Sequence, residues 1–215
     1  MSKLVVIEGL DGCGKSTQLE LLKEAFPTAK VISFPDYESQ TGKLIKSFLA
    51  GDIAANRYAA ACFYATDRYN NFMKNWQHIY HEGTPIICGR YTTSNMIYQG
   101  ASLIDRPNEL EAYLKWLEDL EYSKLLIPRP DKVIYLDIPL AVSKKLLEKR
   151  YNGDASKKDI FERNDNFRAA CEKTANYLIS RNSWKRISCV TSNNDLKSIE
   201  SIHKEIIKEI GRAHV

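Results

Sequence analysis

Three glycines, a lysine and a serine near the amino terminus are spaced to bind phosphate. They lie in the segment Gly9-Leu10-Asp11-Gly12-Cys13-Gly14-Lys15-Ser16, which matches the pattern G-x-x-x-x-G-K-S. In such a loop the backbone N–H groups surround a phosphate, the lysine reaches the β- and γ-phosphates, and the serine hydroxyl binds Mg²⁺. The alternative is a glycine-rich turn with an incidental Lys-Ser pair, but the apolar strand Leu4–Ile7 precedes the loop and a helical segment follows it. The sequence therefore predicts a site for a nucleoside triphosphate and magnesium formed by Gly9, Asp11, Gly12, Cys13, Gly14, Lys15, Ser16 and Thr17, with Ser16 as the metal ligand.

Two further pairs of residues have a spacing that could serve a second ligand. Tyr64 and Arg68 are four residues apart, and so are Asn95 and Gln99. On a helix, residues at this spacing share one face. An aromatic ring can stack on a pyrimidine, and a guanidinium can donate hydrogen bonds to a base carbonyl. The alternative for the first pair is an interior aromatic residue beside a solvated arginine.

Alternating apolar and helical segments must position these residues. Strands followed by helices predict an α/β fold, a doubly wound parallel sheet with ligands at the carboxyl ends of the strands. The phosphate loop follows such an end. The expected strands are Leu4–Ile7, Val31–Phe34, Pro85–Cys88, Val133–Leu136 and Arg186–Val190.

Helices are expected where apolar residues recur every three or four positions. The first begins near Lys15 and ends before Pro27, because a proline disfavours helical geometry in the residue before it. The others are expected at Ala55 to about Tyr80, Pro107 to about Tyr122, and Leu196 to Ile210. The polar segment from Arg150 to Asp159 is either a solvated loop or a lid whose cations approach phosphates.

Composition limits the remaining possibilities. A chain of 215 residues with 44% hydrophobic residues fits one domain. The net charge of +4 is dispersed along the chain, whereas a nucleic-acid-binding surface usually concentrates basic residues. The five cysteines include no C-x-x-C pair, and the first residues form neither a signal peptide nor a membrane span. We therefore expect a cytoplasmic protein with no nucleic-acid or membrane partner. A GTPase is disfavoured because the chain has no Asn-Lys-x-Asp signature.

Further motifs resemble those of the thymidylate kinase family, in the family's order and over nearly the whole chain. They are Ile7 to Thr17, Phe34-Pro35-Asp36-Tyr37, Phe63 to Tyr69, Cys88-Gly89-Arg90-Tyr91, Ser94 to Gly100, and Pro130 to Asp137. The resemblance implies a P-loop NTPase fold, with a five-stranded parallel sheet, helices on both faces and a short lid at about residues 150–163 of a single domain spanning residues 1–215. It also implies transfer of the γ-phosphoryl of ATP to dTMP, giving dTDP, by a homodimer. The long helix containing Ala59, Ala60, Ala61, Phe63 and Phe72 is consistent with a dimer surface.

The resemblance also assigns residues to roles. Lys15, Arg90, Arg150 and Lys158 are expected to be catalytic, with Lys157 and Arg163 as other lid cations. Two departures lie on the acceptor side: no arginine stands beside Pro35, and Gly89 stands where the family usually has aspartate, which leaves Asp11 and Glu8 as candidates to compensate. The expected substrate contacts are Asp11, Phe34, Pro35, Tyr37, Tyr64, Arg68, Arg90, Asn95, Tyr98 and Gln99.

Three alternatives remain at this point. The chain could be another nucleoside monophosphate or deoxynucleoside kinase, because both departures lie on the acceptor side. It could be a nucleotide-binding protein that has lost transfer activity, for which Gly89 is the motive. The dispersed charge disfavours a nucleic-acid-binding protein. Salt-sensitive retention of the protein on nucleic acid would favour this alternative again.

Overall fold

Five parallel strands form the centre of the molecule. The computed structural model describes residues 4–152, 154 and 160–211. The sheet has the strand order β2-β3-β1-β4-β5, and every pairing is parallel. The predicted five-stranded parallel sheet is therefore confirmed. The strands are β1 (Leu4–Glu8), β2 (Lys30–Ser33), β3 (Ile86–Gly89), β4 (Lys132–Asp137) and β5 (Lys185–Ser188).

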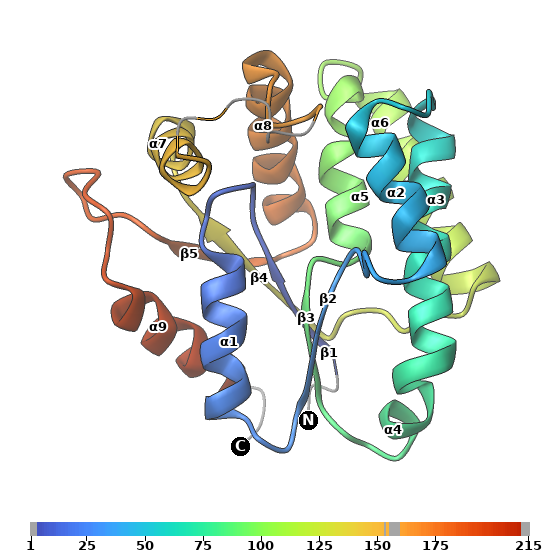
Figure 1. Ribbon diagram of the computed structural model, residues 1–215, viewed down its shortest axis with the longest axis horizontal. Helices are drawn as coiled ribbons and strands as arrows, with labels where there is room; N and C mark the ends of the chain where they lie inside the picture. The colour runs from blue at the N-terminus through green and yellow to red at the C-terminus, as the bar shows by residue number, and fades with distance from the viewer. Residues whose placement is uncertain (1–3, 153, 155–159, 212–215) are drawn as a thin grey trace.

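Helices cover both faces of this sheet, because alternate residues of the central strands point to opposite sides. Val5 and Ile7 of β1 pack on one face, with α1 (Lys15–Ala25) and α9 (Ile199–Gly211). Leu4 and Val6 pack on the other face, against the helices between β2 and β5. Figure 1 shows α1 and α9 on one side of the strands and α3, α5 and α8 on the other.

The remaining helices follow the strands in chain order. Three short segments of other helix types lie among them: η1 and η3 are π-helical, and η2 is a 3₁₀ helix. The full set is α2 (Gln40–Ala50), α3 (Arg57–Asn71), η1 (Phe72–Trp76), α4 (Gln77–His81), α5 (Thr92–Tyr98), η2 (Ala101–Leu103), α6 (Pro107–Glu118), η3 (Asp119–Lys124), α7 (Leu140–Arg150) and α8 (Asp165–Arg181).

The expected helices occur, but three differ in their extent. The segment expected at Ala55 to Tyr80 is α3, η1 and α4, and the π turns carry the buried, mutually packed rings of Phe72 and Trp76. The segment expected to end near Tyr122 changes from α6 to π-helix at Asp119. The last helix begins at Ile199 and not at Leu196, because Leu196 forms an antiparallel bridge with Val190.

Within the described parts of the chain, no helix is long and apolar enough to cross a bilayer.

Candidate active site

The phosphate loop joins β1 to α1 and has the geometry of an anion site. Gly12 has a φ of 83°, and a Cβ atom there would lie 2.8 Å from the carbonyl oxygen of Ser143 on α7, so glycine is required. Gly14 precedes α1 without a side-chain cap, which leaves the N–H groups of the first turn available to a ligand. The Lys15 ammonium group donates to the carbonyl oxygens of Gly9 at 2.7 Å and Leu10 at 2.9 Å.

A cleft of about 640 Å³ opens beside this loop. The exposed Ser16 and Thr17 line it, and the Ser16 hydroxyl makes no hydrogen bond within the described chain. Cys13 also lines it, although its thiol is buried, 3.4 Å from the Lys15 ammonium. Arg150, at the end of α7, lies on the opposite wall. The structure thus brings together the phosphate loop and one of the expected lid cations.

Asp11 connects this cleft to a second, smaller cavity. Its carboxylate forms an ion pair with Arg90 and accepts a hydrogen bond of 2.7 Å from the Tyr98 hydroxyl. Burial would raise the pKa of Asp11, but the charges of Arg90 and Lys15 and the Tyr98 hydrogen bond outweigh it, so the pKa lies below its ordinary value. Burial and the negative charge of Asp11 raise the pKa of Tyr98 well above its usual value. Asp11 is therefore ionised and Tyr98 is a donor at neutral pH.

Arg90 follows β3 and points into the space between the two cavities, both of which it lines. Its backbone is in the left-handed region, with a φ of 61°, and its N–H donates to the carbonyl oxygen of Ile7 on the neighbouring strand. Its Nη1 atom lies 3.9 Å from the buried carboxylate of Glu8. Two carboxylates thus hold one guanidinium at the ends of β1 and β3.

Glu8 itself is fully buried and its oxygens already have partners. Oε1 accepts from the Gly9 N–H at 2.9 Å, and Oε2 accepts from the hydroxyls of Thr93 at 2.6 Å and Ser94 at 2.7 Å. Asp11 uses both of its oxygens as well, with Arg90 and Tyr98. Each oxygen of the two carboxylates thus accepts at least one hydrogen bond, and their negative charge is directed at Arg90 and at the start of α5.

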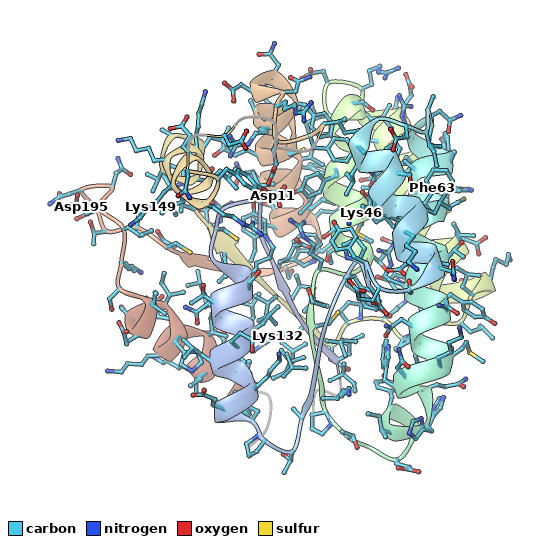
Figure 2. The ribbon with its side chains drawn as sticks, in the orientation of Figure 1. Asp11, Lys46, Phe63, Lys132, Lys149 and Asp195 are labelled. Carbon is cyan, nitrogen blue, oxygen red and sulfur yellow. The ribbon has the colours of Figure 1, made fainter. Side chains whose placement is uncertain are left out.

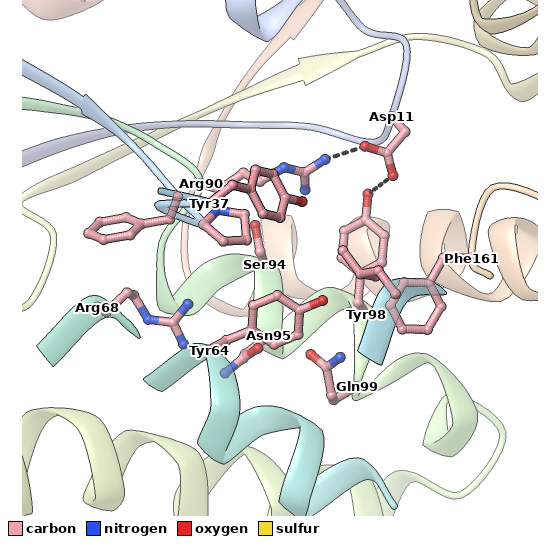
Figure 3. Close-up of a pocket in the computed structure, with 13 residues that line it drawn as sticks. Asp11, Tyr37, Tyr64, Arg68, Arg90, Ser94, Asn95, Tyr98, Gln99 and Phe161 are labelled. Carbon is pink, nitrogen blue, oxygen red and sulfur yellow. Dashed lines mark hydrogen bonds and ion pairs between the residues drawn. The ribbon is translucent and has the colours of Figure 1, made fainter. Parts of the chain in front are cut away.

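The second cavity, of about 80 Å³, has aromatic walls and one polar end. Figure 3 shows Tyr64, Tyr98 and Phe161 around it, Arg90 and Asp11 at one end, and Arg68, Asn95 and Gln99 at the other. Phe34 and Pro35, which are joined by a cis peptide bond, and the half-exposed Tyr37 complete the wall. All the substrate-contact residues expected from the sequence line this cavity.

Arg68 is buried and held by a carboxylate that sequence reasoning missed. Its Nε and Nη2 atoms donate to the two oxygens of Glu121 at 2.7 Å and 2.5 Å. The side chains are 3% and 0% exposed, so this is an interior ion pair. Burial would lower the pKa of Arg68, but the charge of Glu121 raises it above its ordinary value, so Arg68 carries its charge at every relevant pH.

The two amides at this end are oriented differently. Asn95 donates its Nδ2 hydrogens to the carbonyl oxygen of Ala61 at 3.0 Å and to Glu121 at 3.3 Å. Gln99 is 5% exposed, and its Oε1 atom is buried without a hydrogen-bond partner in the described chain. A buried polar atom without a partner is costly, so a group that donates a hydrogen bond to Gln99 Oε1 would be stabilised at this position.

The two departures noted at the acceptor side have local structural causes. A Cβ atom at Gly89 would lie 2.3 Å from Cδ1 of Leu19 and 3.2 Å from Oγ of Ser33, so α1 packs into the space of a larger side chain. Asp36, where an arginine is usual, faces away from the cavity: Asn71 donates to its carboxylate at 3.0 Å, and its N–H donates to Asp67 at 2.9 Å. Among the described residues that line the smaller cavity, Arg90 is thus the one arginine at the end where Asp11 lies.

Several residues of the site were not assigned from the sequence, among them Ser94, Phe161 and Glu121. Ser94 lines the cavity from α5, and Phe161 packs its ring against Tyr98, with 5.9 Å between centroids. Glu121 had a readable signal, since it follows Leu117 by four positions and so continues the apolar stripe of α6. Phe161 had none, because only the fold places it here. Lys158, expected to be a catalytic lid cation, and Lys157 lie outside the described residues.

Comparison with known proteins gives one consistent family. Residues 7–206 match the family model described as thymidylate kinase. A probable thymidylate kinase of Methanococcus aeolicus is 30% identical over 211 residues, covering 98% of this chain and 96% of that protein. The thymidylate kinase of Mycobacterium tuberculosis is 32% identical over 173 residues, covering 74% of this chain and 78% of its own.

A solved structure agrees with these sequence relatives. The thymidylate kinase of Candida albicans has a TM-score of 0.74 and 23% identity, covering 99% of this chain and 92% of that chain. This likeness shows the shared P-loop NTPase fold. Because the family model spans most of the chain and the first relative matches nearly end to end, the chain belongs to the thymidylate kinase family.

Proposed function

We propose that this protein transfers the γ-phosphoryl group of ATP to dTMP, giving ADP and dTDP. The observation that carries the proposal is the continuity of two cavities. The phosphate-loop cleft and the cavity with Arg68, Asn95 and Gln99 share Asp11, Phe34, Pro35, Tyr37 and Arg90 as lining residues. A donor in the first and a nucleotide in the second would therefore meet beside Arg90.

The donor end is assigned to the phosphate loop. Its backbone N–H groups and the ammonium group of Lys15 are proposed to bind the β- and γ-phosphates. Mg²⁺ usually takes one or two protein ligands and completes its shell with phosphate oxygens and water. The free Ser16 hydroxyl fits this need, and the described residues contain no cluster of three metal-binding side chains that would suggest another kind of site. When bound, Mg²⁺ would neutralise phosphate charge.

The acceptor end is assigned to the smaller cavity. Arg90 is proposed to bind the phosphate of dTMP, and the ring of Tyr64 to cover the base. Arg68 would donate to a thymine carbonyl, while an amide oxygen of Asn95 or Gln99 would accept the thymine N–H. The buried Oε1 of Gln99 supports this assignment because it lacks a partner in the described chain.

In phosphoryl transfer the protein mainly aligns two anions and neutralises the charge that is shared between them. The acceptor is an ionised phosphate oxygen, so no side chain has to remove a proton. Arg90 lies between the two cavities, and Arg150 faces the phosphate loop across the cleft. We assign transition-state stabilisation to Arg90 and to cations of the lid, which comprises residues 150–163 of a single domain and includes Arg150 and Lys158.

An ADP-release assay with each common nucleoside monophosphate tests the proposal. We expect dTMP and dUMP to be phosphorylated ahead of dCMP, AMP and GMP. A better rate with one of the other monophosphates would favour a different acceptor. Binding of ATP and dTMP without formation of dTDP would instead mean that the chain is a nucleotide-binding protein without transfer activity.

The same proposal includes a homodimer in a reducing, cytoplasmic setting. Ala60, Ala61 and Phe72 are buried in the protomer core and cannot form its surface. The exposed residues of α3 and η1 instead form a stripe of Tyr58, Cys62, Tyr69 and Met73, at helical spacing. We infer that these exposed apolar side chains form the interaction site, because apolar residues that gather on a surface favour association. The five free cysteines support a reducing compartment.

A further inference from the structure

The base end of the smaller cavity is organised by a single buried carboxylate that does not itself line the cavity. Glu121 is 0% exposed and lies on η3, behind the wall formed by α3 and α5. It accepts two hydrogen bonds from Arg68, one of 2.8 Å from the Thr92 hydroxyl and one of 3.3 Å from Asn95. Residues from two helices thus converge on one side chain.

The first consequence concerns the direction of Arg68. Glu121 occupies the Nε and Nη2 edge of the guanidinium, a bidentate arrangement that fixes the plane of the group. Nη1 makes no hydrogen bond to any described residue, and Arg68 lines the cavity. Arg68 therefore presents a donor, in a fixed direction, to whatever occupies the cavity.

The second consequence concerns the orientation of the Asn95 amide. Ala61 offers a carbonyl oxygen and Glu121 a carboxylate oxygen, both of which only accept hydrogen bonds. The amide group facing them must be the –NH₂ group, so Oδ1 is left for the cavity that Asn95 lines. Asn95 therefore presents an acceptor.

A donor and an acceptor side by side complement the edge of a 4-keto pyrimidine, which offers a carbonyl oxygen and the adjacent ring N–H. Cytosine offers the opposite arrangement, an amino donor and an unprotonated ring nitrogen. Resting on the proposed dTMP kinase activity, we propose that Glu121 is the positioning residue that sets the choice of base, by fixing Arg68 as donor and Asn95 as acceptor.

The replacement Glu121→Gln tests this role with almost no change in volume. An amide can accept at one end only. Because Arg68 donates to both oxygens of Glu121, one of its N–H groups faces an –NH₂ group in either orientation of the amide, and Arg68 must reorient. In one of the two orientations Asn95 faces the –NH₂ group as well. A mismatched polar contact costs enough to change selectivity about tenfold. We expect the ratio of kcat/KM for dTMP to that for dCMP to fall about tenfold, with the KM for ATP unchanged.

Two further variants make the test decisive. Glu121→Asp keeps the negative charge that buried Arg68 requires, but its shorter side chain cannot contact Arg68 and Asn95 together. The ratio of kcat/KM for dTMP to that for dCMP should therefore fall in this variant too. Glu118→Gln is the matched control: this carboxylate lies three residues earlier, pairs with Arg181 at 3.3 Å, and is outside the cavity. Its ratio should equal that of the wild type. A thermal unfolding transition shows whether each variant is folded. If Glu121→Gln does not fold, the selectivity of Glu121→Asp is the test of the positioning role.

The outcomes separate this inference from the proposed function. If the wild-type protein prefers dTMP and the folded Glu121 variants keep the wild-type ratio, the positioning role is wrong and the proposed function stands. A ratio that falls equally in Glu118→Gln would also overturn it, because the effect would then be a general loss of stability. If the wild-type protein does not phosphorylate dTMP, the proposed function itself fails.

Discussion

At the scale of single residues, the proposed active site depends on charges held in place by opposite charges. Arg90 is held by Asp11 and Glu8, and Arg68 is held by Glu121. A buried ion pair adds little stability relative to a hydrophobic pair, but removal of one partner leaves a buried charge without compensation. These residues should therefore show effects on both stability and substrate binding, which have to be measured separately.

Replacement of Lys15 by alanine should abolish transfer while the fold is retained. Lys15 bonds only to atoms of the phosphate loop, whereas the core contacts of α1 come from Leu19 and Leu22. Loss of a preorganised donor at transferring phosphates reduces kcat by about 10²-fold or more. Single-turnover kinetics and a thermal melt measure the two properties. Activity near that of the wild type would remove the central assignment of the donor site.

Replacement of Arg68 by alanine should weaken dTMP binding and leave ATP binding unchanged. It also leaves Glu121 buried without its cation, which costs about 3–5 kcal/mol of stability. Arg68→Lys keeps the positive charge but not the bidentate contact with Glu121. This variant should therefore be more stable than Arg68→Ala and still bind dTMP poorly. Calorimetric titration with each nucleotide distinguishes the effects. Equal losses for ATP and dTMP would contradict the thymine-site assignment.

The ion pair of Asp11 predicts a dependence of stability on acid pH. Its pKa lies below the ordinary value of 3.8 in the folded protein, so the unfolded chain takes up the proton first as pH falls. The stability from this pair is complete above the unfolded pKa and is lost as pH falls through the folded pKa. Melting temperatures of the wild type and Asp11→Asn should therefore differ at neutral pH and converge in acid, once the pH lies below the folded pKa of Asp11. A difference that persists unchanged into strong acid would contradict it.

At the scale of elements, the packing of α1 against β3 accounts for the unusual glycine at the end of that strand. Cδ1 of Leu19 fills the space that a side chain at position 89 would occupy. The helix that carries Lys15 and Ser16 therefore approaches β3 closely. A larger side chain at position 89 would therefore require the Leu19 side chain to move.

Gly89→Ala and Leu19→Ala test this packing as a pair. The added methyl group overpacks a tight contact, which costs about 1–3 kcal/mol. Leu19→Ala alone costs stability through a cavity. In the double variant the new methyl group enters the vacated space, so the loss should be clearly smaller than the sum of the single losses. Denaturant unfolding of the four proteins measures the coupling, and strict additivity would show that Leu19 does not exclude a side chain at position 89.

The elements that could be predicted from the sequence are those defined by local pattern. The strands and the phosphate loop follow from short apolar runs and glycine spacing, and the faces of Tyr64–Arg68 and Asn95–Gln99 follow from helical periodicity. Glu121 was missed because an apolar-stripe search passes over charged residues, although its position in the stripe was visible. Phe161 could not have been found, since it reaches the cavity only through tertiary packing.

At the scale of the whole molecule, the sheet divides the protein into two cores with different tasks. The core under α1 and α9 supports the phosphate loop. The core under α3, α5, α6 and α8 surrounds the smaller cavity. In Figure 2, Asp11 lies between the α7 side, marked by Lys149, and the α2–α3 side, marked by Lys46 and Phe63. The proposed donor and acceptor sites thus belong to opposite halves that meet at the carboxyl ends of the strands.

The apolar stripe on α3 and η1 predicts the assembly state. Met73 is 45% exposed at its end, and a glutamate there would place a charge in the proposed dimer interface. Met73→Glu should sediment as a monomer at micromolar concentration, where the wild type should sediment as a dimer. Ile199→Glu is the control, because Ile199 is 48% exposed but lies on α9, on the opposite face of the sheet. A wild-type monomer, or dissociation by both variants, would contradict the stripe as the interface.

The first turn of α5 joins the two ends of the smaller cavity. Thr92 bonds to Glu121 beside Arg68, whereas the next two residues, Thr93 and Ser94, bond to Glu8 beside Arg90. Arg90, the cation proposed for the phosphate, and Arg68, the donor proposed for the base, thus lie beside carboxylates that are held by consecutive residues of one helical turn. Because the turn is helical, it sets the distance between these two carboxylates, and we infer that the site selects ligands by the distance between base and phosphate. A nucleoside without its phosphate can therefore meet the base end but leaves the Arg90 end unoccupied, so only a nucleotide engages both ends at once.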